Sequence, residues 1–221
     1  MTKATLIIGN KNYSSWSLRP YMALSMAGIP FIEEMIPFGE PRFSKEVRKI
    51  SKAGQVPILL HNDMVINDSL AIIEYAAETW SNRGVWPKYI PARAKARSVS
   101  AEMHAGFRGL RSACPMNLRR QVELPPGGIS DAVARDVARI EELWAECRAE
   151  FAGDDGPFLF GKFCAADAMF TPVVSRLETF AIPVKKSTRE YMDAILATKA
   201  FLRWKEDSTE ETAIVAEDEV D

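Results

Sequence analysis

An excess of basic charge and long apolar runs are both missing from this 221-residue sequence, which limits the partners it can have. Lys and Arg number 28 against 30 Asp and Glu, and the formal net charge at pH 7 is −2. No positive field is available to attract a phosphate backbone or an anionic lipid surface. No run approaches the ~18 apolar residues that a membrane span needs. The composition therefore argues against nucleic-acid and membrane partners.

Cysteine is scarce as well. Cys114, Cys147 and Cys164 are odd in number, widely spaced and without a paired CxxC motif. This pattern argues against a disulfide framework and a zinc site, so we expect no bound metal and a reducing, cytoplasmic location. We interpret the thiols as small buried hydrophobic groups. The rest of the composition, 47% hydrophobic and 26% charged, is typical of a globular chain with a substantial core.

The first 81 residues alternate between strand and helix patterns. Strands are predicted for the short apolar or β-branched runs at 4–9, 31–36, 56–60 and 64–66. Helices are predicted at 15–27, 42–50 and 69–80. The polar turn at 61–63 joins the last two strands as a hairpin. The order strand–helix–strand–helix–hairpin–helix indicates an α/β domain over residues 1–81.

The remainder of the chain has only helical periodicity. A linker at 82–91 carries Gly84, Pro87 and Pro91. Apolar residues then recur every three or four positions along 92–114 and again along 133–151. This predicts an all-helical domain over 92–206. Residues 207–221 are rich in Asp and Glu and poor in large apolar groups, which predicts a disordered, solvated tail.

Three serines in four positions, Ser14, Ser15 and Ser17, lie between the first predicted strand and the first predicted helix. Open α/β sheets bind ligands at the carboxyl ends of their strands. One serine can serve as the helix N-cap, which leaves the others unexplained. The segment is therefore a candidate binding loop.

Two further pieces of the first domain point to a peptide-like ligand. Pro57 stands one residue into a predicted strand, where proline belongs at a strand start or an edge. A cis bond there would leave the backbone of Val56 free to pair with an extended peptide. Asp68 and Ser69 open a helix, where a hydroxyl and free N–H groups form a carboxylate site and can also cap the helix.

In this order and spacing, these pieces resemble the glutathione transferase family. They are the serine loop, Gln55-Val56-Pro57, Asp68-Ser69, the linker with its prolines and the later Gly161…Asp167. The similarity covers most of the chain and is greatest to the serine-type zeta and tau groups. It implies a thioredoxin-like domain with cis Pro57, an all-helical second domain, and usually a homodimer.

The resemblance implies that the thiol of glutathione lies at the serine loop. Ser14, five residues before Arg19, matches the catalytic serine that hydrogen-bonds the sulfur, and Ser15 is the neighbouring candidate. The Val56 position matches the residue whose backbone pairs with the cysteinyl unit.

The same resemblance assigns both carboxylate ends of glutathione. Asp68 and Ser69 match the Glu/Gln-Ser pair that holds the γ-glutamyl end, with Asp one methylene shorter than Glu. Gln55, together with Lys52, is expected at the glycine carboxylate.

Two positions depart from the family pattern. The first loop resembles the Ser-Ser-Cys segment of zeta-type isomerases, except that Trp16 stands here in place of the cysteine. This puts maleylacetoacetate isomerisation in doubt. The Ser/Thr-x-x-Asp capping box of the second domain reads Cys164-Ala165-Ala166-Asp167, which predicts a weakened N-cap.

Thiol activation alone accounts for little of the expected rate enhancement. A free thiol with a pKa near ~8.5 is only about 3% thiolate at pH 7. Lowering this pKa by roughly two units raises the fraction to about 75%, while the loss of intrinsic nucleophilicity leaves a net gain of about threefold. Most of the acceleration must therefore come from positioning the second substrate.

The second-substrate site is expected on the predicted helix 92–114. Met103 and Phe107 form an apolar stripe, which is also typical of a helix core. Arg108 and Arg111 lie beside it with His104 and suit an anionic substrate, although such a set is also typical of a solvated helix face.

Three activities fit this reading. The first is conjugation of glutathione to small electrophiles. The second is cis–trans isomerisation of an unsaturated diacid with glutathione as cofactor. The third is a binding protein without turnover, against which the intact set of Ser14, Pro57 and Ser69 argues. A glutathione-dependent disulfide reductase is disfavoured, because no cysteine lies between Met1 and Trp80.

Overall fold

The first part of the chain is a mixed four-stranded sheet with helices on both faces. The computed structural model describes residues 3–39, 43–124 and 127–220. The strands are β1 (Ala4–Ile8), β2 (Phe31–Met35), β3 (Ile58–His61) and β4 (Met64–Asn67). They are ordered β2-β1-β3-β4, with β1 parallel to β2 and antiparallel to β3. This is the thioredoxin-like arrangement that the resemblance implies.

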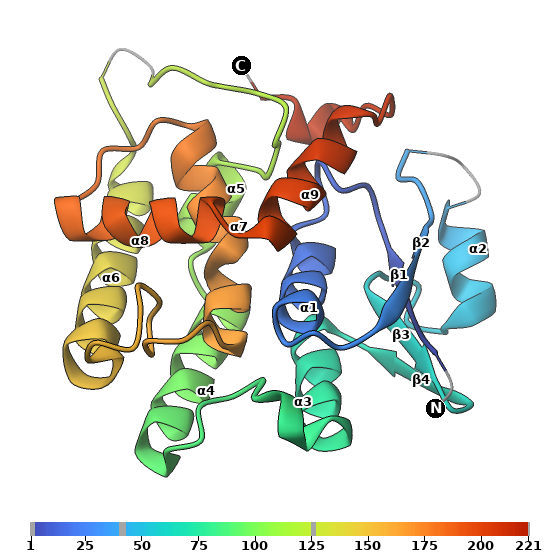
Figure 1. Cartoon of the computed structure of the whole chain (residues 1–221). Helices are drawn as coiled ribbons and strands as arrows, with labels where there is room; N and C mark the ends of the chain where they lie inside the picture. The colour runs from blue at the N-terminus through green and yellow to red at the C-terminus, as the bar shows by residue number, and fades with distance from the viewer. Residues whose placement is uncertain (1–2, 40–42, 125–126, 221) are drawn as a thin grey trace.

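Alternation along β1 divides the core between the two faces of the sheet. Leu6 and Ile8 face α1 (Ser15–Met26) and α3 (Ser69–Thr79) as part of the main core, whereas Ile7 packs on the other face with Val47 of α2 (Phe43–Ile50). Figure 1 shows α1 and α3 between the sheet and the helical part, with α2 on the outer side.

The predicted elements of this part are confirmed within one or two residues at their ends. Met1, Arg42 and Asp221, which bound predicted segments, lie outside the described residues. The hairpin turn is shorter than predicted, because His61 still belongs to β3. Its two remaining residues, Asn62 and Asp63, have φ of 49° and 63°, as a tight two-residue hairpin turn requires.

The second part is helical, as predicted. Its helices are α4 (Ile90–Ala105), α5 (Arg108–Ala113), α6 (Asp131–Cys147), α7 (Ala165–Thr179), α8 (Lys186–Leu196) and α9 (Lys199–Thr209). The single helix predicted over 92–114 is wrong, since it breaks between α4 and α5. Phe107 takes a left-handed φ of 56°, and a Cβ at Gly106 would lie 2.8 Å from the carbonyl oxygen of Glu102. The periodicity of apolar residues continues across this break and conceals it.

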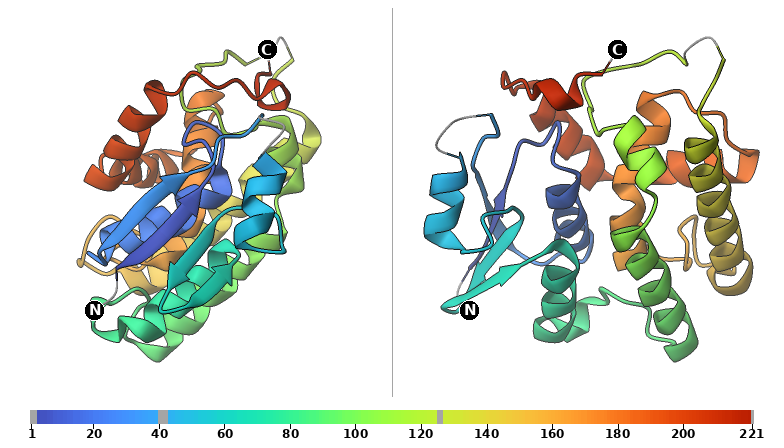
Figure 2. Two further views of the ribbon diagram at one scale, coloured as in Figure 1. Left: turned by 90° about the vertical axis from the view of Figure 1, so that its right-hand side faces the viewer. Right: turned by 180° about the vertical axis from the view of Figure 1, so that it is seen from behind.

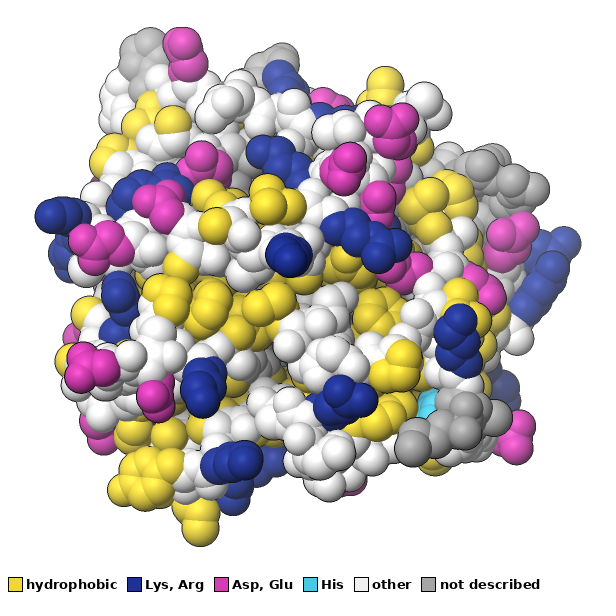
Figure 3. All heavy atoms as spheres, in the orientation of Figure 1, with side chains coloured by type: hydrophobic (Ala, Val, Ile, Leu, Met, Phe, Trp, Pro, Cys, Tyr) yellow, Lys and Arg dark blue, Asp and Glu magenta, His cyan; other side chains and the backbone are white. Residues whose placement is uncertain are grey.

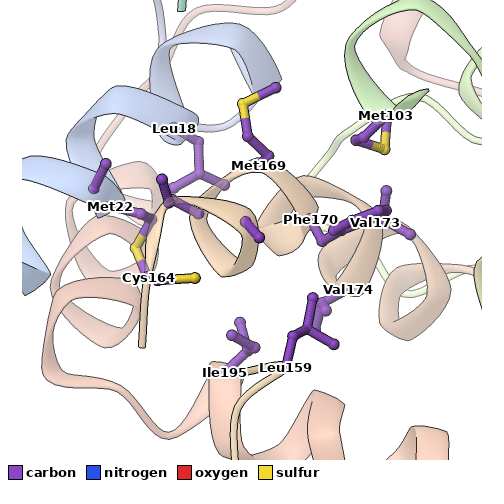
Figure 4. Close-up of a cluster of buried hydrophobic side chains, with 14 of the residues drawn as sticks. Leu18, Met22, Met103, Leu159, Cys164, Met169, Phe170, Val173, Val174 and Ile195 are labelled. Carbon is purple, nitrogen blue, oxygen red and sulfur yellow. The ribbon is translucent and has the colours of Figure 1, made fainter. Parts of the chain in front are cut away.

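Helix α7 forms the centre of the molecule and is buried along its length. Its side chains Phe170 and Val173 belong to one core with Leu18 of α1 and Met103 of α4 (Figure 4). The three cysteines are buried, as interpreted from the sequence. The helical part is thereby fixed to the sheet through α1.

The capping box at the start of α7 is complete despite its cysteine. The Cys164 N–H donates to Oδ2 of Asp167 at 2.8 Å, and Oδ1 accepts from the Leu159 N–H at 3.0 Å and the Tyr191 hydroxyl at 3.1 Å. Burial raises the pKa of this Asp167 carboxyl to about 6. Asp167 thus joins the preceding loop and α8 to α7.

The prediction of a disordered tail over 207–221 is wrong for its described residues. Asp207 to Thr209 belong to α9, and residues 210–220 cross above the start of α1 and end in the turn Ala216–Asp218 (Figures 1 and 2). The acids of the tail are used in specific hydrogen bonds, which composition alone could not indicate. On the face seen in Figure 3, cationic and anionic side chains are interspersed, in keeping with the small net charge.

Candidate functional site

A cleft of about 1020 Å³ lies between the sheet part and the helical part. It brings together most of the predicted site residues, namely Ser14, Ser15, Gln55, Val56, Pro57, Asp68, Ser69, Arg108 and Arg111. Lys52, Met103 and Phe107 are not among its lining residues.

Ser14 is the N-cap of α1. Its Oγ accepts from the Ser17 N–H at 3.3 Å and lies 2.7 Å from the Ser17 Oγ, which itself accepts from the Gly9 N–H. A hydroxyl can donate one hydrogen bond while accepting others. Ser14 therefore stands at the positive end of the helix dipole with its hydroxyl held in a fixed chain of hydrogen bonds.

Ser15 meets a guanidinium from the helical part. Nη2 of Arg176, on α7, donates to the Ser15 Oγ at 3.4 Å, and Nε donates to the Cys114 carbonyl at 2.8 Å. Arg176 is 5% exposed, and burial lowers its pKa to about 10, which leaves it charged at neutral pH. The two serines thus have different partners: Ser14 bonds Ser17 within the first turn, and Ser15 bonds a buried cation.

The Val56–Pro57 peptide bond is cis, as the family resemblance implies. Pro57 is buried immediately before β3, while Val56 is half-buried and Gln55 exposed on the cleft wall. Lys52 is exposed and outside the cleft lining, so its predicted place beside Gln55 is not what the structure gives.

Asp68 and Ser69 open α3, and each has a distinct environment. One Asp68 oxygen caps the helix, accepting from the Leu70 and Ala71 N–H groups at 2.8 and 3.1 Å; the other lies 3.3 Å from Nε2 of His104. Ser69 is fully buried, and its Oγ has no hydrogen-bond partner in the described part of the chain. A buried hydroxyl beside a helix N-terminus suits a carboxylate ligand.

Trp16 lies beside two arginines. The guanidinium carbons of Arg19 and Arg111 are 4.2 and 5.0 Å from its ring centroid, and His104 packs edge-on at 5.2 Å. Burial, then the charges of Arg176 and Arg111, lower the pKa of Arg19 to about 9. All three Arg19 nitrogens lack a hydrogen-bond partner among the residues described. A tryptophan in place of the zeta-type cysteine thus supports a cationic cluster.

The predicted lining of the second-substrate site is only partly correct. Met103 and Phe107 are 0% and 7% exposed and belong to the core, so their assignment to this wall is wrong. Phe107 is turned inward by the break between α4 and α5. Arg108 and Arg111 do line the cleft, which makes this wall cationic rather than apolar.

The tail completes the rim of the cleft. Glu211 accepts from the backbone N–H groups of Lys11 and Asn12 at 2.6 and 3.2 Å, and Glu219 accepts from the Tyr13 hydroxyl at 2.5 Å. Asp218 lines the cleft. The loop that carries the serines is therefore held from the far end of the chain.

Arg176 and Asp218 were missed by sequence reasoning. Arg176 is the single arginine in the apolar stretch 165–177, and this could have indicated a functional role. An arginine is seldom fully buried in a protein unless its charge has a partner. Asp218 gave no such signal, since it is one acid among many in its segment.

Among residues 3–39, 43–124 and 127–220, no helix is long and apolar enough to cross a bilayer. No cluster of three or more His, Cys, Asp or Glu residues that could hold a metal occurs among those same residues.

The sequence is similar to those of known proteins. Residues 13–79 match the family model for the glutathione S-transferase N-terminal domain. Glutathione S-transferase Z1 of Arabidopsis thaliana is 27% identical over 165 residues, 70% of this chain and 74% of that protein. A probable maleylacetoacetate isomerase of Caenorhabditis elegans is 28% identical over 145 residues, 64% of this chain and 68% of that protein.

Solved structures share the fold over nearly the whole length. A glutathione transferase homologue from Burkholderia gl BGR1, with bound glutathione, superposes with a TM-score of 0.72 at 20% identity, covering 95% of this chain and all of that one. A Tau class glutathione S-transferase from mango has a TM-score of 0.66 at 19% identity, covering 94% and 97%. Residues 13–79 therefore form a glutathione S-transferase N-terminal domain, and the whole chain shares the fold of glutathione transferases and is similar to them in sequence.

Proposed function

We propose that the chain is a glutathione S-transferase that binds glutathione in this cleft and transfers its thiol sulfur to small electrophiles. The observation that carries the proposal is the convergence of Ser14, Val56 and Ser69 on one cleft from three separate elements. Each offers what one part of glutathione needs: a hydroxyl at a helix N-terminus for the thiolate, a free backbone edge for the cysteinyl unit and a carboxylate site for the γ-glutamyl end.

Ser14 is the proposed donor to the sulfur. Its hydroxyl is oriented by Ser17, and the N-terminus of α1 favours the thiolate over the thiol. Ser15 is the alternative donor, because the Arg176 guanidinium that bonds its Oγ polarises the hydroxyl. Substitution of each serine by alanine separates the two roles.

The names of the relatives support glutathione chemistry and suggest two reaction types for this chain, transfer and isomerisation. Several are called glutathione S-transferases, whereas maleylacetoacetate isomerase of Rattus norvegicus is 26% identical over 195 residues, 85% of this chain and 86% of that protein. Isomerisation is therefore the second candidate function. Trp16 weighs against isomerisation, because the resemblance to zeta-type isomerases implies a cysteine at this position.

A homodimer in the cytoplasm is part of the proposal. Strand β4 is at the edge of the sheet, and Met64 and Val65 on it are 44% and 46% exposed, which is the kind of apolar surface that a second subunit covers. The measurement for this part is the mass in solution by light scattering.

Glutathione binding measured by calorimetry tests the central claim. We expect micromolar-to-millimolar binding in the parent chain and a loss of roughly tenfold or more in Ser69→Ala, since a hydrogen bond to a charged group is removed. Ser100→Ala is the matched control: Ser100 is also fully buried, its Oγ also has no partner within the described ranges, and it lies outside the cleft lining. Absence of binding in the parent, or equal loss in both variants, would refute the assigned site.

A further inference from the structure

The hydroxyl of Ser17 lies directly behind that of Ser14 and is closed off from solvent. Ser17 is 0% exposed, and its Oγ is 2.7 Å from the Ser14 Oγ. The same Oγ accepts the N–H of Gly9, the residue after β1, at 3.2 Å. Ser14 lines the cleft. The two hydroxyls therefore form a hydrogen-bond chain that runs from the end of a central strand to the cleft.

At 2.7 Å either hydroxyl can be the donor, and a count of hydrogen-bonding groups selects one order. Each hydroxyl has one proton and two lone pairs. If Ser14 donated to Ser17, the Ser17 Oγ would accept both the Ser14 hydroxyl and the Gly9 N–H. The buried Ser17 proton would then have no acceptor among the residues that the structure describes. An unpaired buried donor of this kind is costly.

The opposite order satisfies both hydroxyls. When Ser17 donates to Ser14, the Ser14 Oγ accepts this hydroxyl and the Ser17 N–H at 3.3 Å, which uses both of its lone pairs. The Ser14 proton is then left for an acceptor in the cleft that the residue lines. Hydrogen bonds in a chain polarise one another, so a hydroxyl that accepts two of them becomes a stronger donor.

We infer, on the basis of the glutathione site proposed above, that Ser17 is a positioning residue for the thiol chemistry: it donates to Ser14 and thereby directs the Ser14 proton to the glutathione sulfur. The order of donors is the Gly9 N–H, the Ser17 hydroxyl and the Ser14 hydroxyl, with the thiolate as the last acceptor. No covalent bond changes in this chain. Ser17 acts on the sulfur only through Ser14, which gives the third serine of the loop a role that helix capping does not explain.

The pKa of the bound thiol measures this role, because a serine that only supports packing would not change it. It is obtained by titrating the thiolate absorbance of bound glutathione, with the spectrum of the protein alone subtracted. In Ser17→Ala this pKa should be higher than in the parent chain by about 0.5 to 1, which corresponds to the loss of one hydrogen bond. The acid limb of the pH profile of kcat should move to higher pH by the same amount.

A second substitution keeps the test valid if Ser17→Ala does not fold. Ser17→Cys fills nearly the same space, but a thiol is a weak hydrogen-bond donor, so the pKa of bound glutathione should rise by a similar amount. Ser175→Ala is the control, because Ser175 is 2% exposed on α7, donates to the Pro172 carbonyl at 2.9 Å and lies outside the cleft lining. It loses a buried hydrogen bond and should leave the pKa of bound glutathione unchanged.

Combining Ser17→Ala with Ser14→Ala separates the hydrogen-bond chain from a local disturbance of the loop. If Ser17 acts only through Ser14, the double variant should have the same thiol pKa as Ser14→Ala alone. A further rise in the double variant as large as that in Ser17→Ala would overturn the inference. So would an unchanged thiol pKa in both Ser17 variants, or an equal rise in Ser175→Ala.

Failure of the proposed function has a different signature. If the parent chain does not bind glutathione, or if the bound thiol keeps its free pKa of ~8.5, the cleft does not activate glutathione and the proposed function fails. If glutathione binds with a lowered thiol pKa that neither Ser17 variant changes, only this inference fails.

Discussion

The Oγ atoms of Ser14 and Ser17 lie 2.7 Å apart in the first turn of α1, and the Ser17 Oγ also accepts the Gly9 N–H from the end of β1. The proposed sulfur donor is therefore held by a residue that is itself fixed to the sheet. Such positioning limits the directions in which the Ser14 hydroxyl can point.

Replacing Ser14 with alanine is expected to lower kcat for glutathione conjugation by roughly 10- to 100-fold, because both thiolate stabilisation and orientation are lost. The pKa of bound glutathione, measured by thiolate absorbance, should rise, while its affinity changes little. Ser130→Ala is the control, since Ser130 caps α6 and its loss should cost about 1 kcal/mol of stability without affecting activity. A larger loss in Ser15→Ala than in Ser14→Ala would transfer the role to Ser15.

Replacing Arg19 with methionine is expected to raise the free energy of unfolding by about 1–3 kcal/mol, because a buried and unpaired cation is replaced by an apolar chain of similar volume. Its three nitrogens have no hydrogen-bond partner among the residues that the structure covers. Urea unfolding measures the change, with Arg135→Met on the surface as control. Destabilisation by 2 kcal/mol or so would mean that the stacking on Trp16 outweighs the cost of burial.

Glu211→Gln is expected to loosen the serine loop. The substitution keeps the side-chain length but presents an amide donor where the carboxylate accepts from the Lys11 and Asn12 N–H groups. Hydrogen exchange at residues 10–13 should accelerate, and KM for glutathione should rise by roughly three- to tenfold, equivalent to about 1 kcal/mol. Glu210→Gln, on an exposed neighbour, should leave both unchanged.

The three cysteines are expected to be inert in the native protein. Burial raises the pKa of Cys114 to about 11 and of Cys147 to about 12, so roughly 0.1% or less of either is thiolate at pH 8. Ellman's reagent should therefore label none of the three within minutes, and all three after unfolding in guanidinium. Rapid labelling of one native thiol would contradict the buried packing.

Asp167 is expected to give the stability a pH dependence. Its folded pKa is about 6 against an ordinary value of 3.8, so between these values the folded state binds more protons than the unfolded chain. Stability from this group is therefore greatest below about pH 4 and falls by up to about 3 kcal/mol as the pH rises through 6. Urea unfolding of the parent and Asp167→Asn from pH 4 to 7 measures the difference; a constant difference would show that the hydrogen bonds to Asp167 cancel the cost of burial.

Local rules predict the sheet part well because its elements are short and bounded by strong signals. Gly28 ends α1 with a φ of 63°, and the alternation in β1 fixes which residues enter each core. The serine loop and the cis bond before Pro57 come instead from the ordered set of motifs that resembles a family.

The helical wall of the cleft could not be derived in the same way. The break at Gly106–Phe107 preserves the apolar repeat while turning Phe107 into the core, so periodicity alone suggests a continuous helix. Ordering of the tail depends on partners about 200 residues away, which no local rule can detect. The place of Arg176 in the cleft depends on the packing of α7 against the loop that carries Ser15, which is a long-range contact.

The bond between Glu211 and the Lys11 N–H also has a consequence for synthesis, since its partners are 200 residues apart. At typical translation rates of ~5–20 residues per second, the loop is made roughly 10 to 40 s before the carboxylate that fixes it. While the chain is still being translated, the sheet can assemble around β1 with this loop unfastened. Competence for binding should therefore appear late in synthesis, and a ribosome-bound chain halted before Glu211 would contain the serines without their final geometry.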